Sequence, residues 1–165
     1  MGAILGAVAI TAAALAAGCA SFDGSSLVPG KSTAAEAEAL MGAPAERLET
    51  AGGAKVLFYP QVRETYAVVV GTDGLVRTVE RRRTSANLAK LVPGTTSSKQ
   101  VREIFGPPGH EARSDRQRRD VWEYPYMKGE EYRVIWVQFS LDGVVREVLD
   151  VLDWSMYSQS GPGWQ

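Results

Sequence analysis

His110 is the only histidine in the chain, so acid–base or metal chemistry would have to involve it or the carboxylates. It lies in Gly106-Pro107-Pro108-Gly109-His110, which predicts a loop between a helix and a strand. Glu111 and Asp115 follow at no spacing typical of a catalytic triad, and a zinc site needs several His or Cys ligands. Glu130-Glu131 falls in a predicted turn, where solvation explains both carboxylates. We expect no enzyme activity, no metal and no small-molecule substrate; a polar pocket around His110 would indicate an enzyme instead.

Cys19 is the other reactive side chain and the only cysteine. It ends the run Ala14-Leu15-Ala16-Ala17-Gly18-Cys19, after an uncharged apolar segment that begins at Gly2. That segment is short for a spanning helix, and small residues before a lone cysteine resemble a bacterial lipoprotein signal. In that chemistry residues 1–18 are removed and the Cys19 thiol carries a lipid, and we expect no other cofactor. An ordinary signal peptide, or an anchor helix with an incidental cysteine, is the alternative.

The remaining chain has about 147 residues (165 minus 18), enough for one ordinary domain or two small ones. Its 18 basic and 19 acidic residues nearly cancel, which argues against nucleic acid as a partner. Ala20 follows Cys19, and by resemblance to enteric sorting rules this favours the outer membrane, facing the periplasm. Two basic clusters, Arg81-Arg82-Arg83 and residues 113–119, either contact anionic lipid or an acidic partner, or are solvated connections.

A repeat organises the chain after the signal. Leu27-Val28-Pro29-Gly30 recurs 64 residues later as Leu91-Val92-Pro93-Gly94, and the same order of features follows each copy. The segment Thr72-Asp73-Gly74-Leu75-Val76-Arg77 corresponds in this way to Leu141-Asp142-Gly143-Val144-Val145-Arg146. The sequence therefore predicts a tandem duplication. We expect the following organisation: signal peptide 1–18, flexible tether 19–26, first repeat 27–83, second repeat 84–153 and C-terminal tail 154–165.

Each repeat predicts a short helix and a sheet. Thr33 with Glu36, and Ser97 with Gln100, match the capping box, and the helices should span about 33–42 and 97–106. Both helices are too short to be stable alone and must pack on a sheet. The expected strands are 55–59, 65–70 and 75–81 in the first repeat, and 120–126, 132–140 and 144–151 in the second. The predicted fold class is α+β, two tandem modules with short helices on three-stranded antiparallel sheets.

These motifs carry a family resemblance. The chain resembles the SmpA/OmlA family of small outer-membrane lipoproteins (BamE-like) on Leu-Val-Pro-Gly, a capped helix ending Ile104-Phe105-Gly106-x-Pro108, Trp122-x-Tyr124 and Asp142-Gly143. The match is strongest from Leu91 to Asp150, and residues 27–83 form a degenerate copy. The resemblance implies the fold described above and a place beside the β-barrel assembly machinery. A tandem pair of such modules is also similar to β-lactamase inhibitory proteins, which bind an enzyme through a concave sheet.

The expected function is a non-catalytic outer-membrane lipoprotein that acts as a scaffold or accessory in outer-membrane protein assembly or envelope integrity. Its expected partners are the membrane, through Cys19, and envelope proteins such as the β-barrel assembly machinery. The alternative is an inhibitor-like module that binds an envelope hydrolase. An exposed aromatic groove between the modules would favour the inhibitor, and a closed polar seam the scaffold. The candidate partner-binding residues are aromatic: Tyr59, Trp122, Tyr124 and Trp136. Aromatic residues of the tail, Trp154 among them, contact a bilayer interface or a partner, or Trp154 caps the core.

Overall fold

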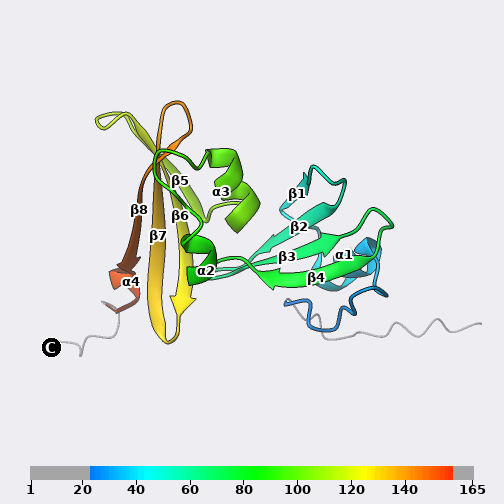
Figure 1. The fold of residues 1–165 in the computed structure, drawn as a ribbon. Coiled ribbons are helices and arrows are strands. Elements are labelled where there is room, and N and C mark those ends of the chain that lie inside the picture. The colour runs from blue at the N-terminus through cyan, green and yellow to red at the C-terminus, as the bar shows by residue number, and fades with distance from the viewer. Residues whose placement is uncertain (1–22, 158–165) are drawn as a thin grey trace, which may run out of the picture.

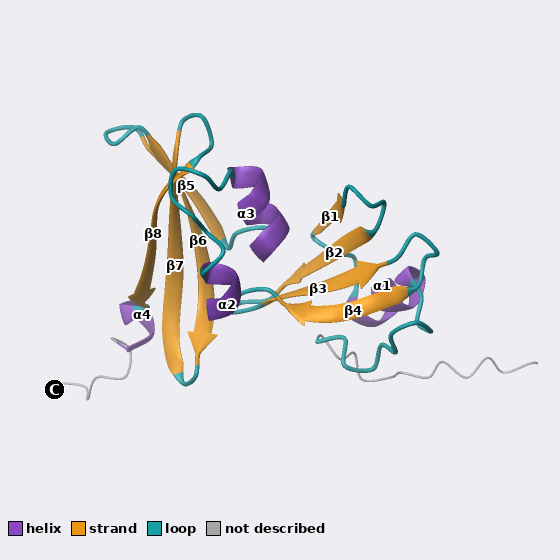
Figure 2. Cartoon of the chain, viewed as in Figure 1, coloured by secondary structure: helices purple, strands orange, loops and turns teal. Residues whose placement is uncertain are grey.

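The computed structural model describes residues 23–157 and shows two modules of α+β type, each built on a four-stranded antiparallel sheet (Figure 1). The first module contains α1 (Ala34–Met41), β1 (Glu46–Glu49), β2 (Lys55–Pro60), β3 (Thr65–Val70) and β4 (Val76–Arg81). The second contains α2 (Ser85–Leu88), α3 (Ser98–Phe105), β5 (His110–Ser114), β6 (Arg119–Lys128), β7 (Glu131–Ser140), β8 (Val145–Leu152) and α4 (Trp154–Tyr157). The strands follow chain order in both sheets, and Figure 2 shows the helices beside them.

Each sheet has one strand more than the sequence predicted. β1 and β5 are edge strands that pair with β2 and β6, so the expectation of three strands is corrected to four. Both carry mostly polar residues, Glu-Arg-Leu-Glu in β1 and His-Glu-Ala-Arg-Ser in β5, because an exposed edge strand needs little apolar surface. His110 therefore begins a strand rather than lying in a loop. Part of the basic segment 113–119 belongs to the β5–β6 hairpin.

The two helices α1 and α3 begin and end as predicted. The Thr33 hydroxyl accepts the backbone N–H of Glu36 at 3.2 Å, and the Glu36 carboxylate accepts the Thr33 N–H at 2.6 Å. Ser97 and Gln100 repeat this capping box at the start of α3. Each helix then stops at a glycine with positive φ. Reciprocal capping satisfies backbone donors that a helix of eight residues would otherwise leave open.

Each sheet buries its helix-covered face, here called the inner face. In the first module α1 contributes Ala37 and Met41 to a core with Leu57, Val68 and Val76. In the second, the core is larger and more aromatic, and it comprises Leu91, Val101, Phe105, Tyr124, Tyr126, Ile135, Val137, Phe139 and Val145. The two cores are separate clusters, so each module has its own centre of hydrophobic burial.

The opposite, outer face of the first sheet is also apolar. Leu48, Val56, Phe58, Ala67 and Val69 form a cluster there, because successive residues of a strand point to opposite faces. The second module covers part of this face, since α3 lies between the second sheet and strands β1 and β2 (Figure 1). A β-carbon placed on Gly106, the C-cap of α3, would lie 2.6 Å from Cδ1 of Phe58. Burial on both faces explains why β2 shows no alternation of apolar and polar residues.

The chain enters the first module along its α1 side. Gly24 is buried, and a β-carbon there would lie 3.0 Å from Sδ of Met41 and 3.2 Å from Cγ1 of Val79. Its carbonyl accepts the N–H of Leu27 at 3.0 Å. The expected tether 19–26 is thus packed on the module from its first described residues onward. Residues 19–22, with Cys19, lie outside the described residues.

The equivalent caps Gly42 and Gly106 provide a matched test of the contact between modules. Both have φ near +80° (86° and 80°), so alanine at either position should cost about 1–3 kcal/mol of backbone strain. Gly42 has open space around its α-carbon, whereas Gly106 faces the buried Phe58 ring. We expect Gly106→Ala to lower the free energy of unfolding by a further ~1–3 kcal/mol through overpacking. Urea denaturation of the two variants measures the difference, and equal losses would contradict this contact.

Candidate functional site

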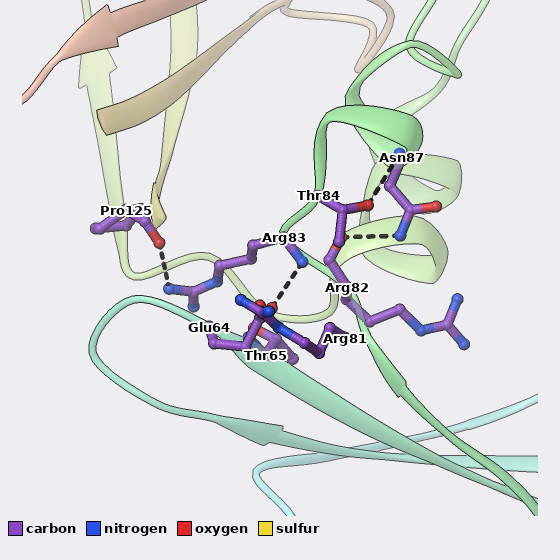
Figure 3. Close-up of polar contacts among 8 residues, drawn as sticks. All are labelled: Glu64, Thr65, Arg81, Arg82, Arg83, Thr84, Asn87 and Pro125. Carbon is purple, nitrogen blue, oxygen red and sulfur yellow. Dashed lines mark hydrogen bonds and ion pairs between the residues drawn. The ribbon is translucent and has the colours of Figure 1, made fainter. Parts of the chain in front are cut away.

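The seam is the contact zone where the β2–β3 turn (residues 61–64) and the connection from β4 to α2 meet the second sheet (Figure 3). Arg83, in that connection, is only 2% exposed. Its Nη1 donates to the carbonyls of Gln61, Val62 and Pro125 at 3.3, 3.4 and 3.0 Å. The first two acceptors belong to the first module and the third to β6 of the second. One buried guanidinium therefore joins backbone groups of both modules.

Glu64 also holds the connection from β4 to α2, by accepting hydrogen bonds from it. It is 7% exposed, and its Oε1 accepts the backbone N–H groups of Thr65 and Arg83, both at 2.9 Å. Its Oε2 accepts Nε of the exposed Arg81 at 2.6 Å. Charge-assisted hydrogen bonds to a buried carboxylate are stronger than neutral ones, so Glu64 fixes where the chain leaves the first sheet.

Two further arginines cross from one module to the other. Arg63 donates with both terminal nitrogens to the Asp153 carboxylate at 3.2 Å and lies 4.5 Å from the centre of the Tyr132 ring. Arg102 of α3 bridges Glu46 of β1 at 2.9 Å and Glu111 of β5 at 2.5 Å. Both contacts lie near the C-terminal end of β2, because Arg63 follows that strand and Glu46 pairs with Phe58. The seam is polar where Arg83 lies.

Burial and hydrogen bonding shift the pKa values of groups at the seam and in the cores. Desolvation lowers the pKa of Arg83, and the Glu64 carboxylate opposes that effect. The Ser155 hydroxyl, and then Arg63, hold the pKa of Asp153 below its usual range. Burial raises the pKa of Tyr59 to about 12 and also raises that of Tyr124. These phenols keep their protons at neutral pH and cannot serve as general bases.

An open groove lies beside the seam, between the outer face of the first sheet and α3. It measures about 640 Å³. Its apolar wall comes from Leu48 and Val56, with Phe58 at its base, and Lys99 and Glu103 of α3 stand opposite. A smaller hollow of about 340 Å³ continues along Leu48 and Lys99 to Trp122. An apolar floor with charged side chains at its rim suits a protein segment that carries an apolar anchor.

The four aromatic residues predicted to bind a partner lie in different environments. Tyr59 is 4% and Tyr124 0% exposed, so both are core residues and offer no contact surface, which corrects that expectation for these two. Trp122 is half-buried, with its ring 4.6 Å from that of Phe139, and reaches the end of the groove. Trp136 is 38% exposed on the outer face of the second sheet. The structure does not bring these residues together into one aromatic surface.

The charged residues singled out in the sequence also separate. His110 is exposed at the start of β5, and Arg113 pairs with Asp120 across the β5–β6 hairpin at 2.7 Å. Arg83 was read only as part of a basic cluster, and its role at the seam was missed. The one available signal was its position between the repeats. Within residues 23–157 no group of three His, Cys, Asp or Glu could hold a metal, and no helix is long and apolar enough to cross a membrane.

Removing the Arg83 side chain tests the seam. Arg83→Ala leaves three backbone carbonyls without their donor and opens a cavity, so we expect a loss of about 2–4 kcal/mol in the free energy of unfolding. Arg77→Ala is the control, because Arg77 forms an exposed pair with Asp73 and should change stability little. Urea denaturation followed by circular dichroism compares the two, and a similar small effect for both would contradict the role of Arg83.

Comparisons with known proteins leave the chain without a family. No family model matches the sequence, and no curated protein matches it. A solved structure of a DUF4309 family protein (YjgB) from Bacillus subtilis subsp. subtilis str. 168 is similar over 78% of this chain and 84% of its own. The sequence identity is 13% and the TM-score is 0.33. A similarity this low identifies neither a shared fold nor a shared function.

Proposed function

We propose that this chain is a non-catalytic lipoprotein of the bacterial outer membrane, anchored through Cys19 and facing the periplasm. It acts as a scaffold or accessory that binds envelope proteins during outer-membrane protein assembly or in maintaining the envelope. The resemblance to the SmpA/OmlA family supports the β-barrel assembly machinery as its first partner to test.

The groove between β1 and α3 is the observation that carries this proposal. Its walls belong to different modules, and its width depends on the contacts of Arg83 and Arg102 that join them. A preformed groove loses little conformational freedom when a partner segment enters it. Leu48 and Val56 supply apolar surface, and the charges of Lys99 and Glu103 supply orientation.

An inhibitor-like module for an envelope hydrolase is the second candidate, and the same groove is the observation in its favour. A loop of an enzyme could enter between the modules as readily as a segment of an assembly factor. The apolar part of the groove wall is mainly aliphatic, with Leu48 and Val56, and Phe58 beneath it is fully buried. The part of the seam around Arg83 is polar. The lack of an exposed aromatic surface in this groove favours the scaffold, whereas an open hollow between the modules that Tyr66 and Tyr132 line favours the inhibitor.

Affinity capture of the tagged, membrane-extracted protein followed by mass spectrometry tests both candidates. We expect wild-type protein to recover components of the β-barrel assembly machinery. Leu48→Glu should lower that recovery by about tenfold or more, because a carboxylate would be buried against the apolar wall. Lys99→Glu should have a smaller effect that depends on salt concentration, because Lys99 lies at the rim.

Two controls make the result specific. Leu141→Glu places the same charge at a leucine that is 52% exposed in the β7–β8 turn, away from the groove, and should leave recovery unchanged. Cys19→Ala should weaken recovery if membrane anchoring contributes. Recovery of one soluble hydrolase that depends on Leu48 but not on Cys19 would overturn the scaffold in favour of the inhibitor.

A further inference from the structure

Exposed apolar side chains lie in the β2–β3 turn of the first module and on α4 of the second. Val62 in the β2–β3 turn is 82% exposed, and on α4 Trp154 is 70% and Met156 38% exposed. Val62 and Met156 line an open hollow of about 800 Å³ between the modules, together with Met127 and Tyr132. We call Val62, Met127, Tyr132 and Met156 the anchor-side face; Trp154, on the same helix as Met156, lines a separate hollow with Trp136. Arg63, which bridges the modules to Asp153, lies within the same hollow.

The chain's N-terminal segment reaches this same hollow. Asp23 and Ser25 line it beside the apolar residues. Cys19 precedes Asp23 by four residues, which span at most about 14 Å when fully extended. A lipid on Cys19 would therefore hold the bilayer close to the anchor-side face.

The arginine-rich segment 113–119 lies at the opposite end of the second module. β6 runs for ten residues from Arg119 to Lys128, so its ends are roughly 30 Å apart. The β5–β6 turn, with the basic segment 113–119, is at the top of this module in Figure 1, whereas the β6–β7 turn is at the bottom with α4. The arginine-rich turn thus lies far from the end that carries the anchor.

The charges around the anchor-side face do not favour an anionic surface. Arg63 is paired with Asp153, and Lys128 lies 3.7 Å from Asp150. The β6–β7 turn adds the exposed carboxylates of Glu130 and Glu131. A membrane contact at this end would have to depend on apolar and aromatic side chains rather than on attraction between opposite charges.

We propose that the anchor-side face rests in the interfacial region of the bilayer that holds the Cys19 lipid, an inference that depends on the lipidation proposed above. Trp and Tyr side chains favour the membrane–water interface because they combine an apolar ring with a polar group. Val62, Met127 and Met156 add apolar area beside Tyr132. A second contact of this kind strengthens lipid anchoring and fixes the orientation of the modules, with the β5–β6 turn pointing away from the membrane.

Site-specific fluorescent labels on the full lipidated protein test this orientation. Lipidation consumes the only native thiol, so an introduced cysteine is the single labelling site. Val62→Cys reports on the anchor-side face. Leu141→Cys is the matched control, an exposed apolar residue in the turn at the opposite end of the second sheet. Each protein is reconstituted on phosphatidylcholine vesicles with and without brominated acyl chains, which quench a fluorophore that contacts them.

We expect brominated lipid to quench the Val62 label by at least about twofold and to leave the Leu141 label unchanged, because only the former lies at the interface. Adding Met156→Ser, at a position that is 38% exposed, should reduce the quenching without unfolding the protein. Quenching should be similar when anionic phosphatidylglycerol is added. Equal quenching of the Val62 and Leu141 labels would overturn the proposal. Quenching that occurs only with anionic lipid would also overturn it.

Intact-protein mass spectrometry separates this result from failure of the proposed function. A lipidated protein with an unquenched Val62 label would overturn the orientation and leave the anchor intact. A protein without lipid on Cys19 would overturn both the anchor and the orientation. Retained quenching in variants that no longer bind a partner through Leu48 would support the orientation independently of the groove.

Discussion

The buried guanidinium of Arg83 is the constraint on which the arrangement of the two modules depends. A buried cation is tolerated only where acceptors surround it, and here the acceptors are carbonyls of the β2–β3 turn and of Pro125 in β6. Proline has no N–H, so the Pro125 carbonyl is the one backbone hydrogen-bonding group at that residue, and Arg83 satisfies it. The Glu64 carboxylate accepts the backbone N–H groups of Thr65 and Arg83, and so holds the start of β3 beside the connection that contains Arg83. The position of α3 over the first sheet, and with it the groove, follows from these contacts.

The two modules share a construction but not a surface. In both modules a capping box begins the longer helix (α1 or α3) and a glycine ends it. Both also have a β-bulge between the last two strands, at Val69/Val70 and at Gln138/Phe139. Their outer faces differ because the first is partly covered by α3 while the second leaves Trp136 exposed. The two outer faces differ because only the first module has a helix of the other module, α3, beside its outer face.

Much of the fold was predictable because its signals are local. Capping boxes, Gly-x-Pro endings and Asp-Gly turns involve residues a few positions apart, and the repeat showed each of them twice. β1 and β5 escaped prediction because edge strands need no alternation of apolar residues. The residues of the site were harder to predict from the sequence. Whether Tyr124 or Trp136 faces the core depends on strand register, and a shift of one residue moves every side chain to the other face. The role of Arg83 depends on carbonyls more than twenty residues away on one side and forty on the other, which no local pattern records.

The contact between Gly106 and Phe58 also bears on how such a chain can evolve. A duplication begins with two copies that fold independently and are each dispensable. Here the outer face of the first sheet is apolar, with Val56, Phe58 and their neighbours, and the second module places a cap without a side chain against it. Deleting the second module would expose an apolar sheet surface that favours aggregation. A side chain at Gly106 would clash with Phe58 and separate the modules. The two modules therefore have to be inherited together, and divergence is freest on the surfaces that they do not share.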